Sequence, residues 1–422
     1  MKRIKREILK DLATSRYKFA KICKNTVFGV YKMFFLDKPY LSDFLKMTLK
    51  ENNIPVVGTK ILEELDLLEG TNIISEIKAI ELAKKTKNLP IYCTSENSIG
   101  WIAKNLDFCE IPNKIELFKD KIKFRKLIKP MFPDFYFKAI NFEDFDDINY
   151  EDFIDEFIIK PSIGFMSMGV YRVTCKQEWD KAKASLKEEV KQSSGLYPLE
   201  VINVKEFIVE ECIEGDEYAV DVYFNTLGEP VILNILEHIF FSDSDVGDRI
   251  YSTSKEIIEK NLEEFTSFMQ KIGELSNMKN FPVHVELRRD KKGVLLPIEV
   301  NPVRFGGWCT TADITYKAYG FNPYLYYYNQ KKPDWKKILA DKKDELYSIV
   351  VLDNSTGMAT NKVKSFDYDK LLSKFEEVLE LRKIDFYRYP VFGFLFTKTK
   401  KENMKELKYI LSSDLKEFIS LS

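Results

Sequence analysis

The chain has 422 residues, enough for about two to four domains of ordinary size. Hydrophobic residues make up 45% and charged residues 31%, which is typical of a globular protein and excludes a largely disordered one. Lys and Arg number 65 against 66 for Asp and Glu, so the net charge of −1 gives no support for wholesale nucleic-acid binding.

Cysteine and histidine are too sparse to build the common metal sites and catalytic triads. None of the six cysteines lies in a CxxC pair, so we expect reduced thiols in a cytoplasmic protein. The two histidines, His238 and His284, leave a Ser-His-Asp triad poorly supplied. The short apolar stretch 27–36 contains Lys32, and we therefore expect neither a signal peptide nor a transmembrane helix.

Residues 1–112 are expected to hold an N-terminal helical segment and a small parallel α/β domain. The first 50 residues are Lys-rich and helical in pattern, and strands alternate with helices from Ile54 onward. The loop at 94–97 is either a ligand-facing loop or a plain helix cap, and its Ser and Asn favour the cap. The chain has no GxGxxG motif, so a dinucleotide site has no support.

The middle of the chain, residues 113–332, is expected to form a domain that contains both strands and helices. The spacing predicts a Lys-rich helix over 114–128, a long amphipathic helix over 254–275 and a Tyr-rich helix over 312–330. A linker near 331–334 then leads to a C-terminal α+β appendage over 333–422. Its expected elements are a strand at 346–353, a helix at 368–384, a strand at 389–399 and a helix at 401–413.

A β-hairpin between residues 282 and 302 carries the strongest chemical signal. Two alternating apolar runs flank a turn at 290–293. Glu299 and Asn301 share a face because they are two residues apart in a strand, and pairing across the hairpin brings Glu286 beside them. Three oxygen-bearing side chains on rigid strands suit Mg²⁺. The alternative is a surface hairpin with solvated acids.

Two further segments carry weaker signals. Lys160 ends an apolar strand, and the loop after it offers Ser162, Ser167, Gly164 and Gly169, which is one way to hold a polyphosphate. It is not a Walker A loop, and an ordinary hairpin with an exposed Lys is the alternative.

The third segment is an apolar strand that ends in Glu210 and Glu211 and turns at Gly215 into a strand carrying Glu217. Backbone groups at such a crossing can bind a flat heterocycle, and a carboxylate nearby can bind ribose hydroxyls. Acidic ends of an ordinary hairpin are the alternative.

The order of these three segments resembles the ATP-grasp superfamily of carboxylate–amine and carboxylate–thiol ligases over roughly residues 50–330. The resemblance implies an ATP-grasp fold of two α+β subdomains that clasp ATP, after a small α/β domain. It also implies site residues, each named here by its expected role: phosphate-binding Lys121 and Lys160, hinge residues Glu210, Glu211 and Ile213, ribose-binding Glu217, magnesium ligands Glu286, Glu299 and Asn301, and Arg304 against the phosphate or the acyl intermediate.

The chain departs from the family pattern at three places. The loop after Lys160 is poor in glycine, which implies a stiffer or differently shaped loop over the phosphates. The run NPVRFGG places Arg304 one residue later than the usual NPRxGG, so its role is open. The C-terminal appendage corresponds to no element of the family.

The resemblance implies an ATP- and Mg²⁺-dependent ligase, with Mn²⁺ as an alternative metal. A carboxylate of an amino acid or small acid would be activated as an acyl phosphate and attacked by an amine, with Lys160 and Arg304 as catalytic groups. The alternatives are a kinase-like or carboxylase-like ATP-grasp enzyme and a non-catalytic ATP-binding module. Small molecules, rather than nucleic acid or membrane, are the expected partners, and a homodimer is left open.

Other residues have two readings each. His284 shares a strand face with Glu286, so it lines the site or packs in the core. His238 is expected at the surface, and Arg249 either lies at the surface, which is favoured, or binds a carboxylate from its loop. Trp308 and Cys309 either line the substrate pocket or pack in the core.

Overall fold

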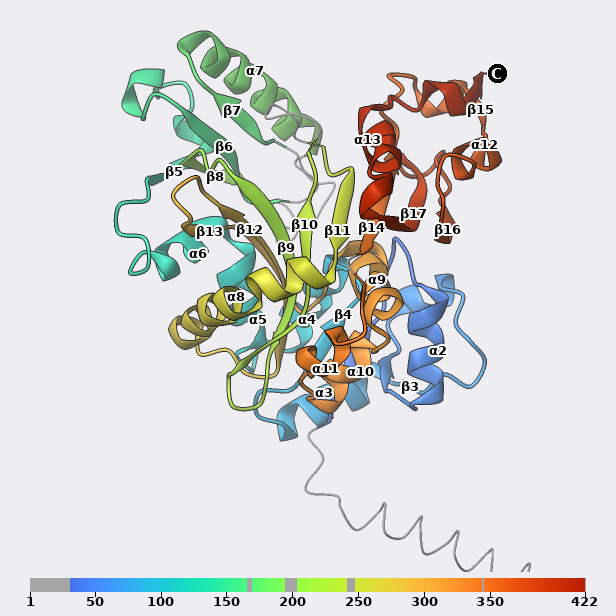
Figure 1. Ribbon diagram of the computed structural model, residues 1–422. Coiled ribbons are helices and arrows are strands. Elements are labelled where there is room, and N and C mark those ends of the chain that lie inside the picture. Colours follow the sequence, from blue (N-terminus) through green and yellow to red (C-terminus); the bar gives the residue numbers. More distant parts are fainter. Residues whose placement is uncertain (1–30, 165–168, 194–202, 241–246, 344, 422) are drawn as a thin grey trace, which may run out of the picture.

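The computed structural model describes residues 31–164, 169–193, 203–240, 247–343 and 345–421 (Figure 1). The helix expected within residues 1–30, and Ser167 of the expected phosphate loop, lie outside the described residues. Among the helices that are described, none combines the length and the apolar character needed to cross a bilayer.

The N-terminal domain is a parallel four-stranded sheet in the order β3-β2-β1-β4, as the alternating pattern predicted. Its central strand β1 lies within the first 50 residues, where only helix was expected. A short, fully buried run such as Met33–Phe35 cannot be told from a buried helical segment by periodicity. The domain's elements are β1 (Met33–Phe35), α2 (Asp43–Glu51), β2 (Val56–Val57), β3 (Ile73–Ile74), α3 (Glu76–Lys85), β4 (Ile91–Cys93) and α4 (Ile99–Asn105).

Two helices replace the single helix expected over 114–128. They are α5 (Ile111–Lys119) and α6 (Lys121–Ile128), and Asp120 between them caps α6. Its carboxylate accepts hydrogen bonds from the N–H groups of Ile122 at 2.9 Å and Lys123 at 3.2 Å. Asp120 therefore ends α5 and begins a second helix at Lys121, so the expected single helix is interrupted there.

An antiparallel sheet with its own core follows, and we call it the β6 sheet. Its strand order is β5-β8-β6-β7, and α7 (Lys176–Ser193) covers one face (Figure 1). Trp179 of α7 packs against Phe157 and Val209 in a separate hydrophobic cluster. The strands are β5 (Phe137–Asn141), β6 (Phe157–Ile163), β7 (Tyr171–Val173) and β8 (Asn203–Glu211).

The large sheet has eight strands in the order β13-β12-β9-β10-β11-β14-β17-β16. Helix α8 (Lys255–Ser276) packs against β10. The first five of these strands in sheet order belong to the middle of the chain: β13 (Leu295–Pro302), β12 (Phe281–Arg289), β9 (Asp216–Phe224), β10 (Pro230–His238) and β11 (Ile250–Thr253).

The C-terminal α+β part is present, but its strands continue the large sheet, a junction the sequence did not reveal. Strand β14 pairs antiparallel with β11, with Ile250 opposite Val350. We call this β11–β14 pairing the seam. The elements of the C-terminal part are β14 (Glu345–Asp353), β15 (Val363–Phe366), α12 (Tyr368–Leu372), β16 (Val378–Lys383), β17 (Val391–Lys400), α13 (Lys405–Ser412) and β18 (Ile419–Leu421).

Two helix predictions near the C-terminus were too long. The stretch 368–384 gives the short helix α12 and then edge strand β16, because its apolar spacing also fits a strand paired with β17. The stretch 312–330 is broken by Gly320, whose φ of 76° ends a helix. It gives α9 (Thr310–Tyr319) and α10 (Pro323–Asn329), and α11 (Trp335–Leu339) follows.

Candidate active site

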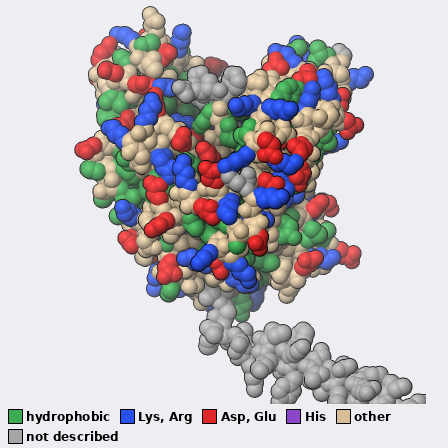
Figure 2. All heavy atoms as spheres, viewed as in Figure 1, with side chains coloured by type: hydrophobic (Ala, Val, Ile, Leu, Met, Phe, Trp, Pro, Cys, Tyr) green, Lys and Arg blue, Asp and Glu red, His purple; other side chains and the backbone are tan. Residues whose placement is uncertain are grey.

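A cavity of about 460 Å³ lies between the β6 sheet and the large sheet. Figure 2 shows acidic and basic side chains interspersed over the face in view, which is hollowed between the lobe of the β6 sheet and the C-terminal part. Eight of the expected site residues line the cavity: Lys121, Lys160, Glu210, Glu211, Ile213, Glu217, Glu286 and Glu299. Of the described residues, Asn301 and Arg304 lie outside this lining, further along the chain from Glu299.

The basic wall of the cavity is organised around a buried acid. Glu210, at the end of β8, forms an ion pair with Lys160 of β6 and accepts a hydrogen bond from Nε of Arg125 at 2.8 Å. Burial alone would raise the pKa of Glu210, but the Arg125 and Lys160 cations hold it at about 2. Arg125 was not predicted as a site residue, although it lies four residues after Lys121 on α6 and so shares its helix face.

Two carboxylates face each other on the opposite wall. In the β12–β13 register Glu286 lies directly opposite Glu299, and His284 opposite Asn301, as the hairpin pattern predicted. Burial, and then the charge of Glu299, raises the pKa of Glu286 well above its ordinary value. Lys121, whose Nζ lies 3.7 Å from Oε1 of Glu299, lowers the pKa of Glu299 in spite of burial.

This wall fits a hard divalent cation. Within the described part of the chain, the side chains of Glu286 and Asn301 make no hydrogen bond or ion pair, so their oxygens remain available. Two like charges on facing strands destabilise each other unless a cation lies between them. Carboxylate and amide oxygens on one strand face are the donors that Mg²⁺ prefers.

The far end of the cavity is a network around Glu217. Arg288 donates to one oxygen of Glu217 through Nε at 2.9 Å and through Nη1 to the carbonyl of Ile213 at 2.6 Å. Nδ1 of His238 lies 3.0 Å from the other oxygen of Glu217. His238 is thus buried in the site, and its expected surface position was wrong; the sequence showed only its place at a strand end. With Asp248, the ligand atoms of Glu217 and His238 lie within 4.8 Å of one another, a second donor set for a cation.

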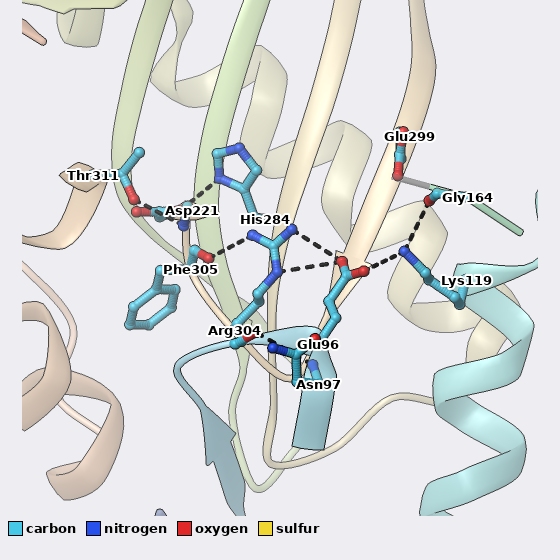
Figure 3. A network of polar contacts seen from close by, with 12 residues as sticks. Glu96, Asn97, Lys119, Gly164, Asp221, His284, Glu299, Arg304, Phe305 and Thr311 are labelled. Carbon is cyan, nitrogen blue, oxygen red and sulfur yellow. Dashed lines mark hydrogen bonds and ion pairs between the residues drawn. The ribbon is translucent and has the colours of Figure 1, made fainter. Parts of the chain in front are cut away.

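Arg304 lies in a separate network at the loop after β13 (Figure 3). Its Nη2 and Nε donate to Oε1 of Glu96 at 3.0 and 3.3 Å. The other carboxylate oxygen of Glu96 pairs with Lys119, and Nζ of Lys119 donates to the carbonyl of Gly164 at 3.0 Å. The cap expected at residues 94–97 is present, since Ser95 caps the short turn that holds Glu96, and none of these four residues lines the cavity.

The same loop is tied to the core by a buried acid. Oδ1 of Asp221 lies 2.8 Å from Nδ1 of His284 and accepts the N–H of Gly306 at 3.0 Å. His284 is thus buried opposite Asn301 and oriented by Asp221, outside the lining of the cavity. The sequence offered no signal for Asp221, which reads as one of many alternating strand residues.

The C-terminal part holds the loop from its other side. Nη1 of Arg382 on β16 donates to the carbonyl of Trp308 at 3.1 Å, and Nη2 pairs with Asp313 of α9 at 2.5 Å. Trp308 packs against aromatic rings of the C-terminal part, and Cys309 is buried, so both residues serve packing.

Arg249 was expected at the surface, but it is 9% exposed. It pairs with Asp353 at 2.8 Å and donates to the carbonyls of Ile410 and Ser413. Arg249, which directly precedes β11, thus fastens the C-terminal part, and its guanidinium is engaged by that part of the chain and not by the cavity.

Comparison with known proteins places this arrangement among known folds. Residues 154–312 match the family described as the ATP-grasp domain. A comparison with curated proteins found no match.

Solved structures of similar fold extend over nearly the whole chain. An L-amino acid ligase from Bacillus licheniformis is 15% identical, with a TM-score of 0.64 over 93% of this chain and 99% of that one. An N5-carboxyaminoimidazole ribonucleotide synthetase from Thermotoga maritima is 15% identical, with a TM-score of 0.57 over 93% and 99%. A 2-oxoglutarate carboxylase biotin carboxylase domain from Hydrogenobacter thermophilus, in complex with MgADP, ADP and bicarbonate, is 12% identical, with a TM-score of 0.57 over 93% and 91%. At these identities the likeness is one of fold, and it confirms the expected fold class.

Proposed function

We propose, because residues 154–312 form an ATP-grasp domain, that the protein is an ATP- and Mg²⁺-dependent ligase that joins a small carboxylate to an amine. One observation carries the proposal: a single cavity is lined both by the cations Lys121 and Lys160 and by the facing acids Glu286 and Glu299, with Nζ of Lys121 3.7 Å from Oε1 of Glu299. Amino acids are the favoured substrates, since the L-amino acid ligase is similar over nearly its full length.

The nucleotide would lie between the two sheets with its phosphates toward the basic wall. The N–H of Ile213 has no partner among the described residues and is free to hold adenine, whereas its carbonyl already accepts from Arg288. The carboxylate of Glu217 is already paired with Arg288, so it would accept hydrogen bonds from ribose hydroxyls while it keeps that ion pair. Lys160 is buried against Glu210, which directs its ammonium group rather than leaving it mobile.

Glu286, Glu299 and Asn301 are the residues that would hold Mg²⁺, and Mn²⁺ suits the same oxygens. The bound ion would offset charge on the β- and γ-phosphate oxygens. A substrate carboxylate oxygen then attacks the γ-phosphorus, and the bond to ADP breaks. The amine attacks the resulting acyl phosphate, loses a proton and displaces phosphate.

Arg304, which is held by Glu96 and by the carbonyl of Phe305, is proposed to bind the anion formed during this sequence. Lys119, Lys121 and Lys160 all act on Glu299, so the metal wall and the basic wall form one electrostatic unit. Preorganised charges stabilise a phosphoryl-transfer transition state without a protein nucleophile.

The test is ADP formation by the full chain with Mg·ATP and pools of amino acids, amines and small carboxylates, with product masses measured in parallel. We expect ADP that depends on a substrate pair and a product that has lost one water. Lys160→Met and Glu299→Gln should each lower the rate by at least about 100-fold. Glu116→Gln, which removes an exposed ion pair with Lys123, is the matched control and should keep full activity.

The carboxylase-type alternative is favoured by the similar domain solved with bicarbonate. ADP formation that requires bicarbonate, with a product heavier by one carboxyl group, would replace the ligase by a carboxylase. Tight ATP binding without ADP formation from any pool would contradict both reactions and support a binding module.

A further inference from the structure

Glu96 is a first-domain residue that enters a network otherwise built from the ATP-grasp part. It follows β4 in a short turn that is fixed at both ends. The N–H of Cys93 donates to the carbonyl of Val303 at 2.7 Å, so β4 is already joined to the loop that carries Arg304. The approach of Glu96 to Arg304 is therefore built into the backbone and does not depend on a long, mobile side chain.

The contacts of Glu96 are those of a fixed anion between two cations. Its side chain is 10% exposed, that of Arg304 is 14% exposed and that of Lys119 is 2% exposed. Arg304 and Lys119 hold the pKa of Glu96 at about 2 against the effect of burial, so the carboxylate is ionised at neutral pH. Charge-assisted bonds of this kind fix side-chain direction more strongly than neutral ones.

The pairing leaves part of Arg304 free. Nε and Nη2 donate to Glu96, and Nη1 donates to the carbonyl of Phe305 at 2.9 Å. A guanidinium group has five N–H donors, so one on each terminal nitrogen remains for an anion. Figure 3 shows Glu96 between Arg304 and Lys119, with Glu299 on the same side of the network as Lys119 and Gly164. The charges of Lys119 and Glu96 both act on Glu299, which places the network beside the metal-ligand candidates.

We propose that Glu96 is a positioning residue for phosphoryl and acyl transfer: its carboxylate aims the guanidinium of Arg304 at the reacting anion and, through Lys119, holds the end of β6 at Gly164. The role rests on the proposed function. Because Glu96 belongs to the first domain, this role gives that domain a part in the reaction. Strand β6, which Glu96 holds through Lys119, also carries Lys160. Glu96 touches no substrate in this account and acts only through its two cations.

The decisive experiment is a double-mutant cycle on the full chain. Glu96→Gln should lower kcat on the order of 100-fold, because misdirection of a catalytic group by about 1 Å costs that much. KM for ATP should stay within about two-fold, since no cavity residue is lost. Arg304→Ala should give a similar loss, and the loss in the double variant should fall at least about ten-fold short of the product of the two single losses, because Glu96 acts largely through Arg304. Glu116→Gln is again the control.

A second measurement is independent of activity. We expect phenylglyoxal to modify Arg304 several-fold faster in Glu96→Gln than in the wild type, as read by peptide mass spectrometry, because the guanidinium is released from its partner. Equal labelling rates would overturn the pairing, and unchanged kcat in Glu96→Gln or fully additive losses would overturn the role. An inactive wild type would refute the proposed ligase, whereas an active wild type with an unaffected Glu96→Gln would refute only this inference.

Discussion

Glu210→Gln tests whether a single buried acid holds the basic wall of the cavity together. Glu210 is 3% exposed and lies between Lys160 and the guanidinium of Arg125. Its pKa in the folded protein is about 2, below its ordinary value of 4.5. Each pKa unit corresponds to about 1.4 kcal/mol, so the ionised carboxylate contributes about 3 kcal/mol to folding at pH 7. Removal of one partner from a buried ion pair costs a similar amount, about 3–5 kcal/mol.

The sign of the pH dependence follows from the direction of the pKa change. Because the folded pKa of Glu210 lies below the unfolded one, its stabilisation is complete above about pH 4.5 and is lost as the pH falls toward about 2. We therefore expect the stability difference between the wild type and Glu210→Gln to be about 3 kcal/mol at pH 7 and less than half of that near pH 3. Other carboxylates titrate in both proteins and cancel in the difference.

The assay is urea unfolding followed by intrinsic fluorescence, with both proteins measured from pH 7 to pH 3. Glu116→Gln is the control, because its ion pair with Lys123 is about half exposed and is expected to be worth less than about 1 kcal/mol. A difference below about 1 kcal/mol at pH 7, or one that stays constant across the pH range, would refute the reasoning.

Three further predictions concern the metal wall, the loop after β13 and the C-terminal part. Glu299→Gln should abolish the increase in Tm that Mg·ADP gives the wild type; an equal increase would remove Glu299 from the ligand set. Gly306→Ala should lower stability by about 1–3 kcal/mol in thermal unfolding, because its Cβ would lie 2.3 Å from Thr311, whereas Gly307→Ala meets open space and should be neutral; equal effects would contradict the packing. Asp313→Asn should cost about 3 kcal/mol, since it leaves the buried guanidinium of Arg382 with the partly exposed Glu380 as its remaining carboxylate partner, and a loss below about 1 kcal/mol would speak against the link.

The parts of the site that could be predicted from the sequence are those whose residues lie close together along the chain. Glu286, Glu299 and Asn301 lie on one hairpin, so strand periodicity and a turn were enough to bring them together. Lys160 and Glu210 lie in apolar strands, which is a local signal even though their pairing is not; Lys160 was expected to end its strand, but β6 continues past it to Ile163. The parallel N-terminal sheet likewise followed from simple alternation.

The parts that could not be predicted depend on contacts between distant segments. Arg304 and Glu96 are separated by 208 residues, and Arg125 and Glu210 by 85. No periodicity within either segment reports the other, so only the folded chain shows which acid meets which base. The helix predicted over the residues of β16 was wrong for a related reason. Whether this stretch forms a strand depends on the edge that β17 offers for pairing and not on its own apolar spacing.

The seam between β11 and β14 makes the C-terminal part inseparable from the rest of the large sheet. A chain ending at residue 344 would lose β14, β16 and β17 and leave the hydrogen-bonding groups of β11 without the partners they have at Ile250–Thr253. An open, uncovered strand edge templates pairing with other chains, so such a truncated protein should self-associate in sedimentation experiments, and a monodisperse monomer would contradict this. Any exchange of this region between related proteins would have to match strand register across the seam, which restricts recombination here more than at a flexible linker.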